Sequence, residues 1–297
     1  MAPAVKWADP ETTARGKVRA KVEPGTLKTL WLNTGTLCNI ECAHCYIESS
    51  PRNKRLEYLT AAQARPLLEE ALEMGAREIG FTGGEPFLNP EMIAMAEECL
   101  ERGLSVLILT NAMAPMMNRT HELLDLHRRF GERLSLRVSL DHHQPAAHDA
   151  ERGAGAFDKT ISGLRWLLDT GLRTSVAGRA FVEEDENVAR EGYRRALGRE
   201  VELIIFPEMG ATDELPEITT DCWGILGKAP ETVMCASSRM VVKRAGDAKP
   251  AVVACTLIPY DARFELGRTV RESWRPVSLQ HPHCASFCVL GGGSCST

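Results

Sequence analysis

"TLCNIECAHCYIES", residues 36–49, places Cys38, Cys42 and Cys45 on one short stretch behind an apolar segment. Three thiolates at this spacing can occupy three corners of a compact metal site. A structural zinc requires four protein ligands, and the only other local candidate, His44, directly adjoins Cys45. A [4Fe–4S] cluster held by three thiolates instead leaves one iron free to bind a substrate or cofactor. We therefore interpret the stretch as an iron–sulfur loop, with zinc binding and core packing as the alternatives.

The segments that follow this loop alternate between strand and helix patterns. "TAAQ" at Thr60 is a capping box for a helix ending near Gly75, and Asn89 followed by Pro90 predicts a second helix start. Further helices are expected at 120–130, 157–170 and 187–197. Six apolar segments predict strands: 27–33, 77–86, 104–112, 133–141, 173–182 and 200–209. This order predicts an α/β fold with a parallel sheet and helical crossovers.

The composition is that of an ordinary globular protein, with 44% hydrophobic and 25% charged residues in 297. A formal net charge of −5 argues against broad electrostatic capture of nucleic acid or anionic lipid. The first residues lack the apolar core of a secretory signal, and no apolar run approaches the ~18 residues that span a bilayer. We therefore expect a cytoplasmic protein without nucleic-acid or membrane partners. Clustered thiols in that compartment more often bind metal than form disulfides.

The pattern changes after about Met209. The stretch 210–230 is rich in turn formers, and 239–255 predicts two strands around a Gly/Asp/Pro turn, a β-hairpin. The tail "HPHCASFCVLGGGSC", residues 281–295, is irregular and rich in cysteine. We divide the chain into an N-terminal arm (1–26), a barrel domain (27–214) and a small C-terminal domain (215–297).

Two motifs together resemble the radical S-adenosylmethionine (radical SAM) superfamily. The first is Cys-x3-Cys-x2-Cys followed by an aromatic residue, Tyr46, after the first expected strand. The second is the glycine turn "TGGEP", residues 82–86, after the second expected strand. The resemblance covers about residues 28–210 and implies a partial (β/α)6, TIM-like barrel, which agrees with the six expected strand–helix units.

The resemblance implies that Cys38, Cys42 and Cys45 hold a [4Fe–4S] cluster whose open iron binds SAM. Once reduced by a donor such as flavodoxin or ferredoxin, the cluster would cleave SAM to a 5′-deoxyadenosyl radical. That radical would abstract a hydrogen atom from an organic substrate. The protein would supply positioning and exclusion of water and oxygen.

Barrel sites lie at the C-terminal ends of the strands, so the resemblance implies SAM contacts there. The candidates are Tyr46, Gly83, Gly84, Glu85, Asn111, Ser139, Asp141, Arg179 and Phe206. The glycines would let the backbone approach the methionine end of SAM. Arg179 would pair with the SAM carboxylate, and Phe206 would contact the adenine. The alternatives are turn or cap roles for Asn111 and Asp141, a surface ion pair for Arg179 and core packing for Phe206.

The late cysteines resemble the auxiliary-cluster extensions of radical SAM enzymes, the SPASM and smaller twitch domains. Five residues are candidates: Cys235, Cys255, Cys284, Cys288 and Cys295. They exceed the four thiolates of one [4Fe–4S] cluster and fall short of eight for two. One auxiliary [4Fe–4S] cluster with a spare cysteine is the preferred count. A second cluster that uses Cys222 and an open iron is the alternative, and zinc is a further one.

The substrate class stays open. An arm of only about 26 residues is too short for a separate peptide-recognition domain, which favours a small molecule. Residues 139–157 resemble the segment after the fourth strand of radical SAM peptide maturases, where Arg152 and Gly153 lie on the loop before the next helix, and this favours a peptide. The non-enzymatic alternative is a zinc-stabilised binding module.

Overall fold

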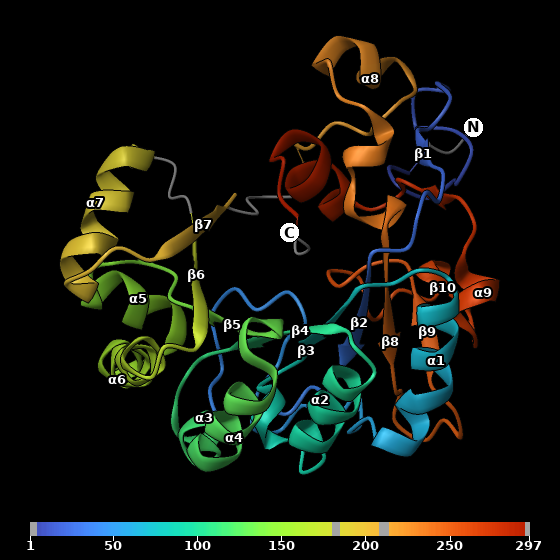
Figure 1. The fold of residues 1–297 in the computed structure, drawn as a ribbon. Helices are drawn as coiled ribbons and strands as arrows, with labels where there is room; N and C mark the ends of the chain where they lie inside the picture. The colour runs from blue at the N-terminus through green and yellow to red at the C-terminus, as the bar shows by residue number, and fades with distance from the viewer. Residues whose placement is uncertain (1–4, 180–184, 208–213, 295–297) are drawn as a thin grey trace.

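The computed structural model describes residues 5–179, 185–207 and 214–294. Its main feature is a nine-stranded sheet in the order β10-β9-β8-β2-β3-β4-β5-β6-β7 (Figure 1). The strands of this sheet are β2 (Thr29–Asn33), β3 (Glu78–Thr82), β4 (Ser105–Thr110), β5 (Leu134–Ser139), β6 (Arg173–Arg179), β7 (Glu202–Phe206), β8 (Ser238–Val242), β9 (Ala251–Val253) and β10 (Glu265–Gly267). The helices are α1 (Ala61–Glu73), α2 (Met92–Glu101), α3 (Ala114–Met117), α4 (Thr120–Phe130), α5 (Pro145–Arg152), α6 (Ala156–Asp169), α7 (Glu186–Leu197), α8 (Asp221–Leu226) and α9 (Val270–Ser273).

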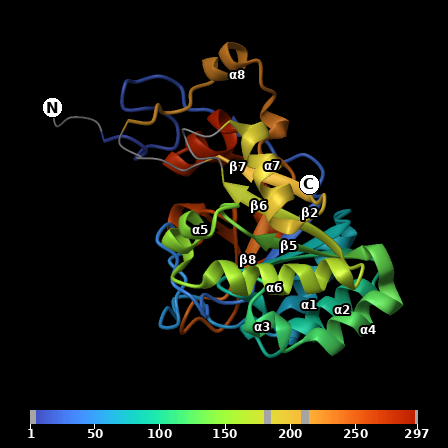
Figure 2. The same ribbon diagram turned by 90° about the vertical axis from the view of Figure 1, so that its left-hand side faces the viewer.

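Strands β2 to β7 all run parallel, which confirms the predicted α/β barrel sheet. Helices α1, α2, α4 and α6 form a layer on one face of the sheet (Figure 2). Their apolar faces pack on the strands in one large core, in which Leu30, Ile79 and Ile108 are fully buried. Because all six strands share one direction, their carboxyl ends meet at the same edge of the barrel.

Local sequence explains where the first two helices begin. Thr60 caps α1, with the reciprocal hydrogen bonds of a capping box to Gln63, as predicted. The helix predicted to start at Pro90 begins at Met92, and Glu91, which takes the N-cap position, makes no side-chain cap bond. Asn89 Oδ1 accepts from the Glu91 N–H at 2.9 Å just before the helix, and the Asn89 amide donates to the Thr34 and Leu59 carbonyls at the two ends of the loop between β2 and α1.

The expected hairpin forms, and it extends the barrel sheet. β8 and β9 pair antiparallel, with Met240 opposite Val253. β8 also pairs in parallel with β2, with Thr29 opposite Ser238. This second pairing was not expected from the sequence. We call residues 214–294 the C-terminal lobe; its first strands are therefore continuous with the barrel.

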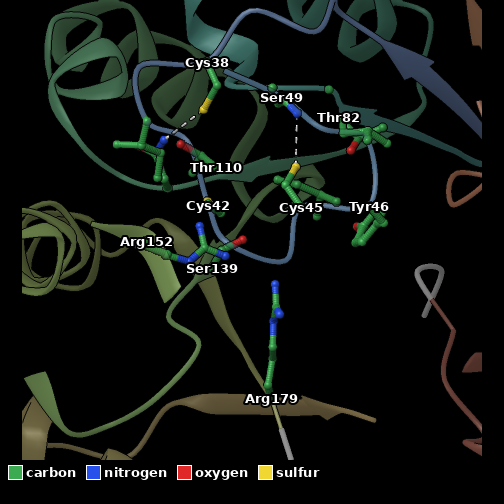
Figure 3. Close-up of a pocket in the computed structure, with 16 residues that line it drawn as sticks. Cys38, Cys42, Cys45, Tyr46, Ser49, Thr82, Thr110, Ser139, Arg152 and Arg179 are labelled. Carbon is green, nitrogen blue, oxygen red and sulfur yellow. Dashed lines mark hydrogen bonds between the residues drawn. The ribbon is translucent and has the colours of Figure 1, made fainter. Parts of the chain in front are cut away.

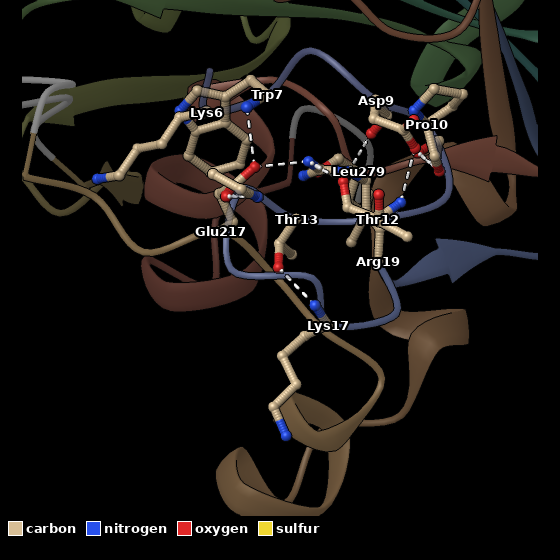
Figure 4. Close-up of polar contacts among 12 residues, drawn as sticks. Lys6, Trp7, Asp9, Pro10, Thr12, Thr13, Lys17, Arg19, Glu217 and Leu279 are labelled. Carbon is tan, nitrogen blue, oxygen red and sulfur yellow. Dashed lines mark hydrogen bonds and ion pairs between the residues drawn. The ribbon is translucent and has the colours of Figure 1, made fainter. Parts of the chain in front are cut away.

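The N-terminal arm, residues 5–26, packs against this lobe (Figures 1 and 4). Its strand β1 (Lys21–Val22) pairs antiparallel with β11 (Val277–Ser278). The buried Arg19 guanidinium forms an ion pair with Glu217 at 2.5 Å and donates to the Asp9 and Thr12 carbonyls. Buried pairs of this kind are costly to break because one charge is then left alone. The arm is thus anchored to the C-terminal lobe.

A second core lies on the other face of the sheet, between the strands and the C-terminal lobe. It combines Trp7 of the arm and Trp31 of β2 with Met240 and Phe264 of the lobe. Among the described helices, none is both long and apolar enough to cross a membrane.

Candidate functional site

The loop that follows β2 places its three cysteines in one pocket at the carboxyl edge of the barrel (Figure 3). We call this the cysteine pocket. The Cys38 N–H donates to the Ser50 carbonyl, and the Ser49 N–H donates to Cys45 Sγ at 3.3 Å. The pocket wall consists of Cys38, Ile40, Cys42, Cys45, Tyr46, Ile47, Ser49, Thr82, Gly83, Gly84, Leu109, Thr110, Asn111, Ser139, Arg152 and Arg179. Residues from the ends of β3 to β6 therefore face the same space as the thiols.

The three thiols fit a cluster better than a single metal ion. Burial raises the pKa of Cys38 to about 12 and also raises that of Cys42, so binding as thiolates requires a compensating cation. In a [4Fe–4S] cluster each of three thiolates binds a different iron, and one iron is left without a protein ligand.

The glycine turn after β3 fits under the cysteine loop. A Cβ on Gly84 would lie 2.1 Å from the Leu37 carbonyl oxygen, and one on Gly83 would lie 2.5 Å from that of Gly35. The Gly84 and Glu85 N–H groups donate to the carbonyls of Gly35 and Leu37. Both glycines line the pocket, where their contact with SAM stays a prediction, and they also have a packing role that the sequence did not reveal. Without side chains at these positions, the backbone of the glycine turn contacts the backbone of residues 35–37, which precede Cys38.

Gly84→Ala should therefore disturb the cysteine loop. Because the Leu37 backbone must move to admit the methyl group, we expect the free energy of unfolding to fall by about 1–3 kcal/mol. We also expect iron bound by the first cluster to decrease. Denaturant unfolding and iron analysis measure both effects. Gly224→Ala is the matched control, since nothing lies within 4 Å of its Cβ position. A Gly84→Ala protein with the stability and iron content of the wild type would contradict this packing role.

Glu85 lies behind the pocket wall, fully buried. Its carboxylate accepts hydrogen bonds from the Thr110 hydroxyl at 2.9 Å, from the Asn111 N–H at 2.9 Å and from the Phe87 N–H. The side chain thus fastens the end of β4 to the turn after β3. Burial raises the pKa of Glu85 to about 7, against the hydrogen bonds that lower it. The structure places Glu85 as a support for the pocket wall, and it does not line the pocket itself.

This raised pKa predicts a pH dependence of stability. The folded-state pKa of about 7 exceeds the ordinary value of 4.5, so the folded chain binds the proton more tightly than the unfolded chain does. The stabilisation of the fold by protonated Glu85 is fully present below pH 4.5 and is lost as the pH rises through 7. Between pH 5 and 8 we expect the wild type to lose about 2–3 kcal/mol more than Glu85→Gln. Parallel stability curves for the two proteins would show that Glu85 titrates normally.

Two arginines at the pocket share one buried carboxylate. Asp141 pairs with Arg152 at 2.7 Å and with Arg179 at 3.3 Å. Burial raises the pKa of Asp141, but Arg152 and Arg179 outweigh it and hold the pKa below its usual value. Both guanidiniums reach the pocket wall, whereas Asp141 does not. Arg179 extends toward the cysteine loop from the end of β6 (Figure 3). Asp141 is thus an anchor that orients two cations.

Arg152 lines the cysteine pocket, although the sequence analysis did not include it among the SAM contacts. It was expected on a loop before the next helix, but it is the last residue of α5. Pro145 at the first turn and Gly153 after the last are the helix signals that could have placed it. The neighbouring Glu151 accepts from the Ala43 N–H through its carbonyl and pairs with His44 at 2.8 Å. The end of α5 therefore contacts the cysteine loop directly.

Of the remaining residues predicted to contact SAM, three line the cysteine pocket and one does not. Tyr46, Asn111 and Ser139 line the pocket, and the Asn111 amide donates to Asn39 of the cysteine loop at 2.9 Å. Phe206 does not line it; its ring centroid lies 5.5 Å from that of Phe287 in the C-terminal lobe.

Four of the five late cysteines line a second cavity, inside the C-terminal lobe. They are Cys235, Cys255, Cys284 and Cys288, with His283 and apolar side chains around them. Cys284 and Cys288 lie on the π-helix Cys284–Leu290 (η6), and the Leu257 N–H donates to Cys255 Sγ at 3.2 Å. Cys295 lies outside the described residues. Burial raises the pKa of Cys235 to about 11 and that of Cys284 to about 12.

The two other cysteines lie apart from this cavity. Cys99 is fully buried in the core beneath α2. Cys222 belongs to α8, where its Sγ accepts from the Thr219 N–H at 3.4 Å, and it is not part of the cavity wall.

Tyr260 connects the C-terminal lobe with the cysteine loop. Its hydroxyl donates to the Ile47 carbonyl at 2.7 Å, and the Arg55 guanidinium lies 3.4 Å from its ring centroid. The next loop residue, Glu48, has a positive φ of 51°. The lobe that carries the second cavity thus holds the turn just after Cys45.

Comparisons with known proteins agree with this geometry. The profile of the Radical SAM superfamily matches residues 32–190. The subtilosin biosynthesis protein AlbA of Bacillus subtilis is 30% identical over 48% of this chain and 31% of its own length. An AdoMet-dependent heme synthase of Methanosarcina barkeri is 33% identical over 44% of this chain and 36% of its own. The chain therefore aligns with about a third of each of these two relatives.

Among solved structures, Streptococcus suis SuiB superposes with a TM-score of 0.60 at 12% identity, over 84% of this chain and 66% of SuiB. SuiB bound to its precursor peptide SuiA superposes with a TM-score of 0.57 at 13% identity, over 84% of this chain and 65% of SuiB. At these identities the likeness shows the fold.

Proposed function

Since the chain belongs to the radical SAM superfamily, we propose that it binds a [4Fe–4S] cluster through Cys38, Cys42 and Cys45 and uses SAM to abstract a hydrogen atom from an organic substrate. The observation that carries this proposal is the cysteine pocket. Three thiols, a glycine turn and two guanidiniums share one wall at the carboxyl edge of the parallel strands. With three protein ligands, one iron is left for SAM.

A reduced cluster held by Cys38, Cys42 and Cys45 would supply the one electron that cleaves SAM to methionine and a 5′-deoxyadenosyl radical. The chain's own residues position the reactants. Arg152 and Arg179 carry the positive charge at the pocket, and Asp141 holds both guanidiniums in place, so we assign them to the SAM carboxylate. Thr82 and Gly83 offer backbone groups, and Ser139 a hydroxyl, to the polar remainder of SAM.

We assign one auxiliary [4Fe–4S] cluster to the second cavity, with Cys235, Cys255, Cys284 and Cys288 as its ligands. Four thiols around one enclosed, largely apolar space match the ligand number of such a cluster. Cys295 is then the spare cysteine. An auxiliary cluster can accept an electron from a substrate radical, which makes the overall reaction an oxidation or a bond formation. The first cluster requires an external electron donor such as flavodoxin or ferredoxin.

For the substrate we propose a peptide. Two similar proteins support this class: a bacteriocin biosynthesis protein, and SuiB, solved with a precursor peptide. The superposition with SuiB extends over 84% of the chain, beyond the barrel alone. The heme synthase favours the alternative, a small molecule, which the sequence analysis preferred.

The experiment is anaerobic reconstitution followed by reduction in the presence of SAM. We expect about eight irons per chain, and release of methionine and 5′-deoxyadenosine. Peptides and small molecules carrying deuterium are then compared for deuterium transfer into 5′-deoxyadenosine. Transfer from a small molecule and from no peptide would overturn the proposed substrate class. A colourless protein that binds zinc and ignores SAM would overturn the proposed function.

A further inference from the structure

Arg239, in β8, is buried with its full charge. It has 0% exposure, and its hydrogen bonds to the described residues all go to backbone carbonyls. Nε donates to Ser273 at 3.0 Å, Nη2 to Arg275 at 3.0 Å, and Nη1 to Ser238 at 2.7 Å and to Cys235. The Trp274 ring covers the group, with its centroid 4.6 Å from Cζ. The carbonyls satisfy its hydrogen-bonding groups but do not cancel its charge.

Two other arginines with little exposed side-chain surface pair with a carboxylate. Arg19 pairs with Glu217, and Arg152 pairs with Asp141. Within the described ranges, Arg239 has no ion pair. Removing a cation from water without an anion nearby is expensive, so proteins pair such charges or place them beside a bound ion. The missing anion of Arg239 therefore needs an explanation.

The second cavity offers an explanation for the missing anion. Arg239 Nη1 donates to the carbonyl of Cys235, whose thiol lines that cavity. Burial lowers the pKa of Arg239 to about 10, and Cys235 and Cys255 act against that shift when they are thiolates. A cubane bound by four thiolates is an anion in both of its redox states, and reduction adds one more negative charge. The cluster would therefore be the anion that compensates the buried charge of Arg239. In turn, the fixed cation would stabilise the more negative, reduced form of the cluster.

We propose that Arg239 is the counter-ion of the auxiliary cluster and raises its reduction potential. This inference rests on the proposed function, which assigns a cluster to the second cavity. Arg239 is a positioning residue in this account, since its charge acts on the cluster from behind Cys235. It would set how readily the auxiliary cluster accepts an electron.

The test uses a chain in which Cys38, Cys42 and Cys45 are all alanine, so that only the auxiliary cluster remains. Iron content and the potential from an EPR-monitored redox titration are the readouts. Arg239→Met and Arg239→Lys lose the same planar fork but differ in charge. We expect Arg239→Met to shift the one-electron reduction equilibrium at least tenfold toward the oxidised form, which is 59 mV. Arg239→Lys should stay within about threefold of the parent. Arg275→Gln, which removes an exposed charge nearby, should leave the equilibrium unchanged.

The outcomes separate the two claims. A parent chain without iron would overturn the auxiliary cluster itself. A parent with iron whose Arg239→Met and Arg239→Lys variants shift equally, or not at all, would overturn the role of Arg239 alone. If neither variant folds, the crystal structure of the iron-loaded wild type decides. If the cluster is the nearest anion to the Arg239 guanidinium, the inference is upheld. If a carboxylate contacts the guanidinium instead, the inference is overturned.

Discussion

Cys42→Ala should reduce the release of 5′-deoxyadenosine to the level of a reaction without protein. The cysteine pocket holds three thiols, and we assign one iron to each, with the fourth left for SAM. Without Cys42, a second iron loses its protein ligand and the cluster is no longer held in place. We expect iron to fall from about eight to about four per chain, and SAM cleavage to vanish.

The measurement is mass spectrometry of 5′-deoxyadenosine after anaerobic reduction with dithionite and SAM. Cys99→Ala is the matched control, because Cys99 lies in the core beneath α2 and away from both cavities. It should keep the iron content and the cleavage rate of the wild type. Cys42→Ala protein that still cleaves SAM at the wild-type rate would exclude this thiol as a cluster ligand.

Cys255→Ala should separate SAM cleavage from product formation. Cys255 lines the second cavity with Cys235, Cys284 and Cys288. Its loss should again remove about four irons, but this time from the auxiliary cluster. The cysteine pocket stays intact, so 5′-deoxyadenosine remains measurable. Product formation should stop if the auxiliary cluster is the electron acceptor of the substrate radical, as we propose.

Iron analysis, 5′-deoxyadenosine release and product mass are compared in the same preparation. Cys222→Ala is the control for this variant, since Cys222 lies outside the cavity wall. It should keep all of the iron if there is one auxiliary cluster, and should lose iron if Cys222 serves a further one. Full turnover by Cys255→Ala protein that lacks its second cluster would refute a catalytic role for the late cysteines.

The barrel could be predicted because its signals are local. Buried strands such as 104–112 are continuous apolar runs, and Thr60 with Gln63 forms a capping box in the sequence and in the structure. The cysteine spacing and the glycine turn are likewise contained in short stretches. These features depend on neighbours along the chain, so sequence alone reveals them.

The errors arose where a distant contact decides the outcome. Asn89 is predicted as a helix cap, but its amide also donates to two carbonyls of the loop between β2 and α1, and α2 begins only at Met92. Glu85 stands in the glycine motif, yet its carboxylate faces Thr110 and Asn111 behind the wall. Hydrogen-bond partners that are remote in sequence leave no periodic pattern, so such roles require the fold.

The same reason explains the missed residues. Arg152 becomes recognisable only when Asp141, eleven positions earlier, is seen to hold it beside the thiols. The parallel pairing of β8 with β2 joins segments about two hundred residues apart. Arg239 reads as an ordinary strand cation until its burial and its bond to Cys235 are known.

The central claim is a cubane with one iron left open for SAM, and one measurement tests it most directly. EPR spectra of the reduced Cys255→Ala variant, in which only the first cluster is expected to give a signal, are recorded anaerobically with and without SAM. We predict a [4Fe–4S] signal whose g-values change when SAM is added. A spectrum that ignores SAM, because a side chain already fills that position or because no cubane is present, would contradict the account.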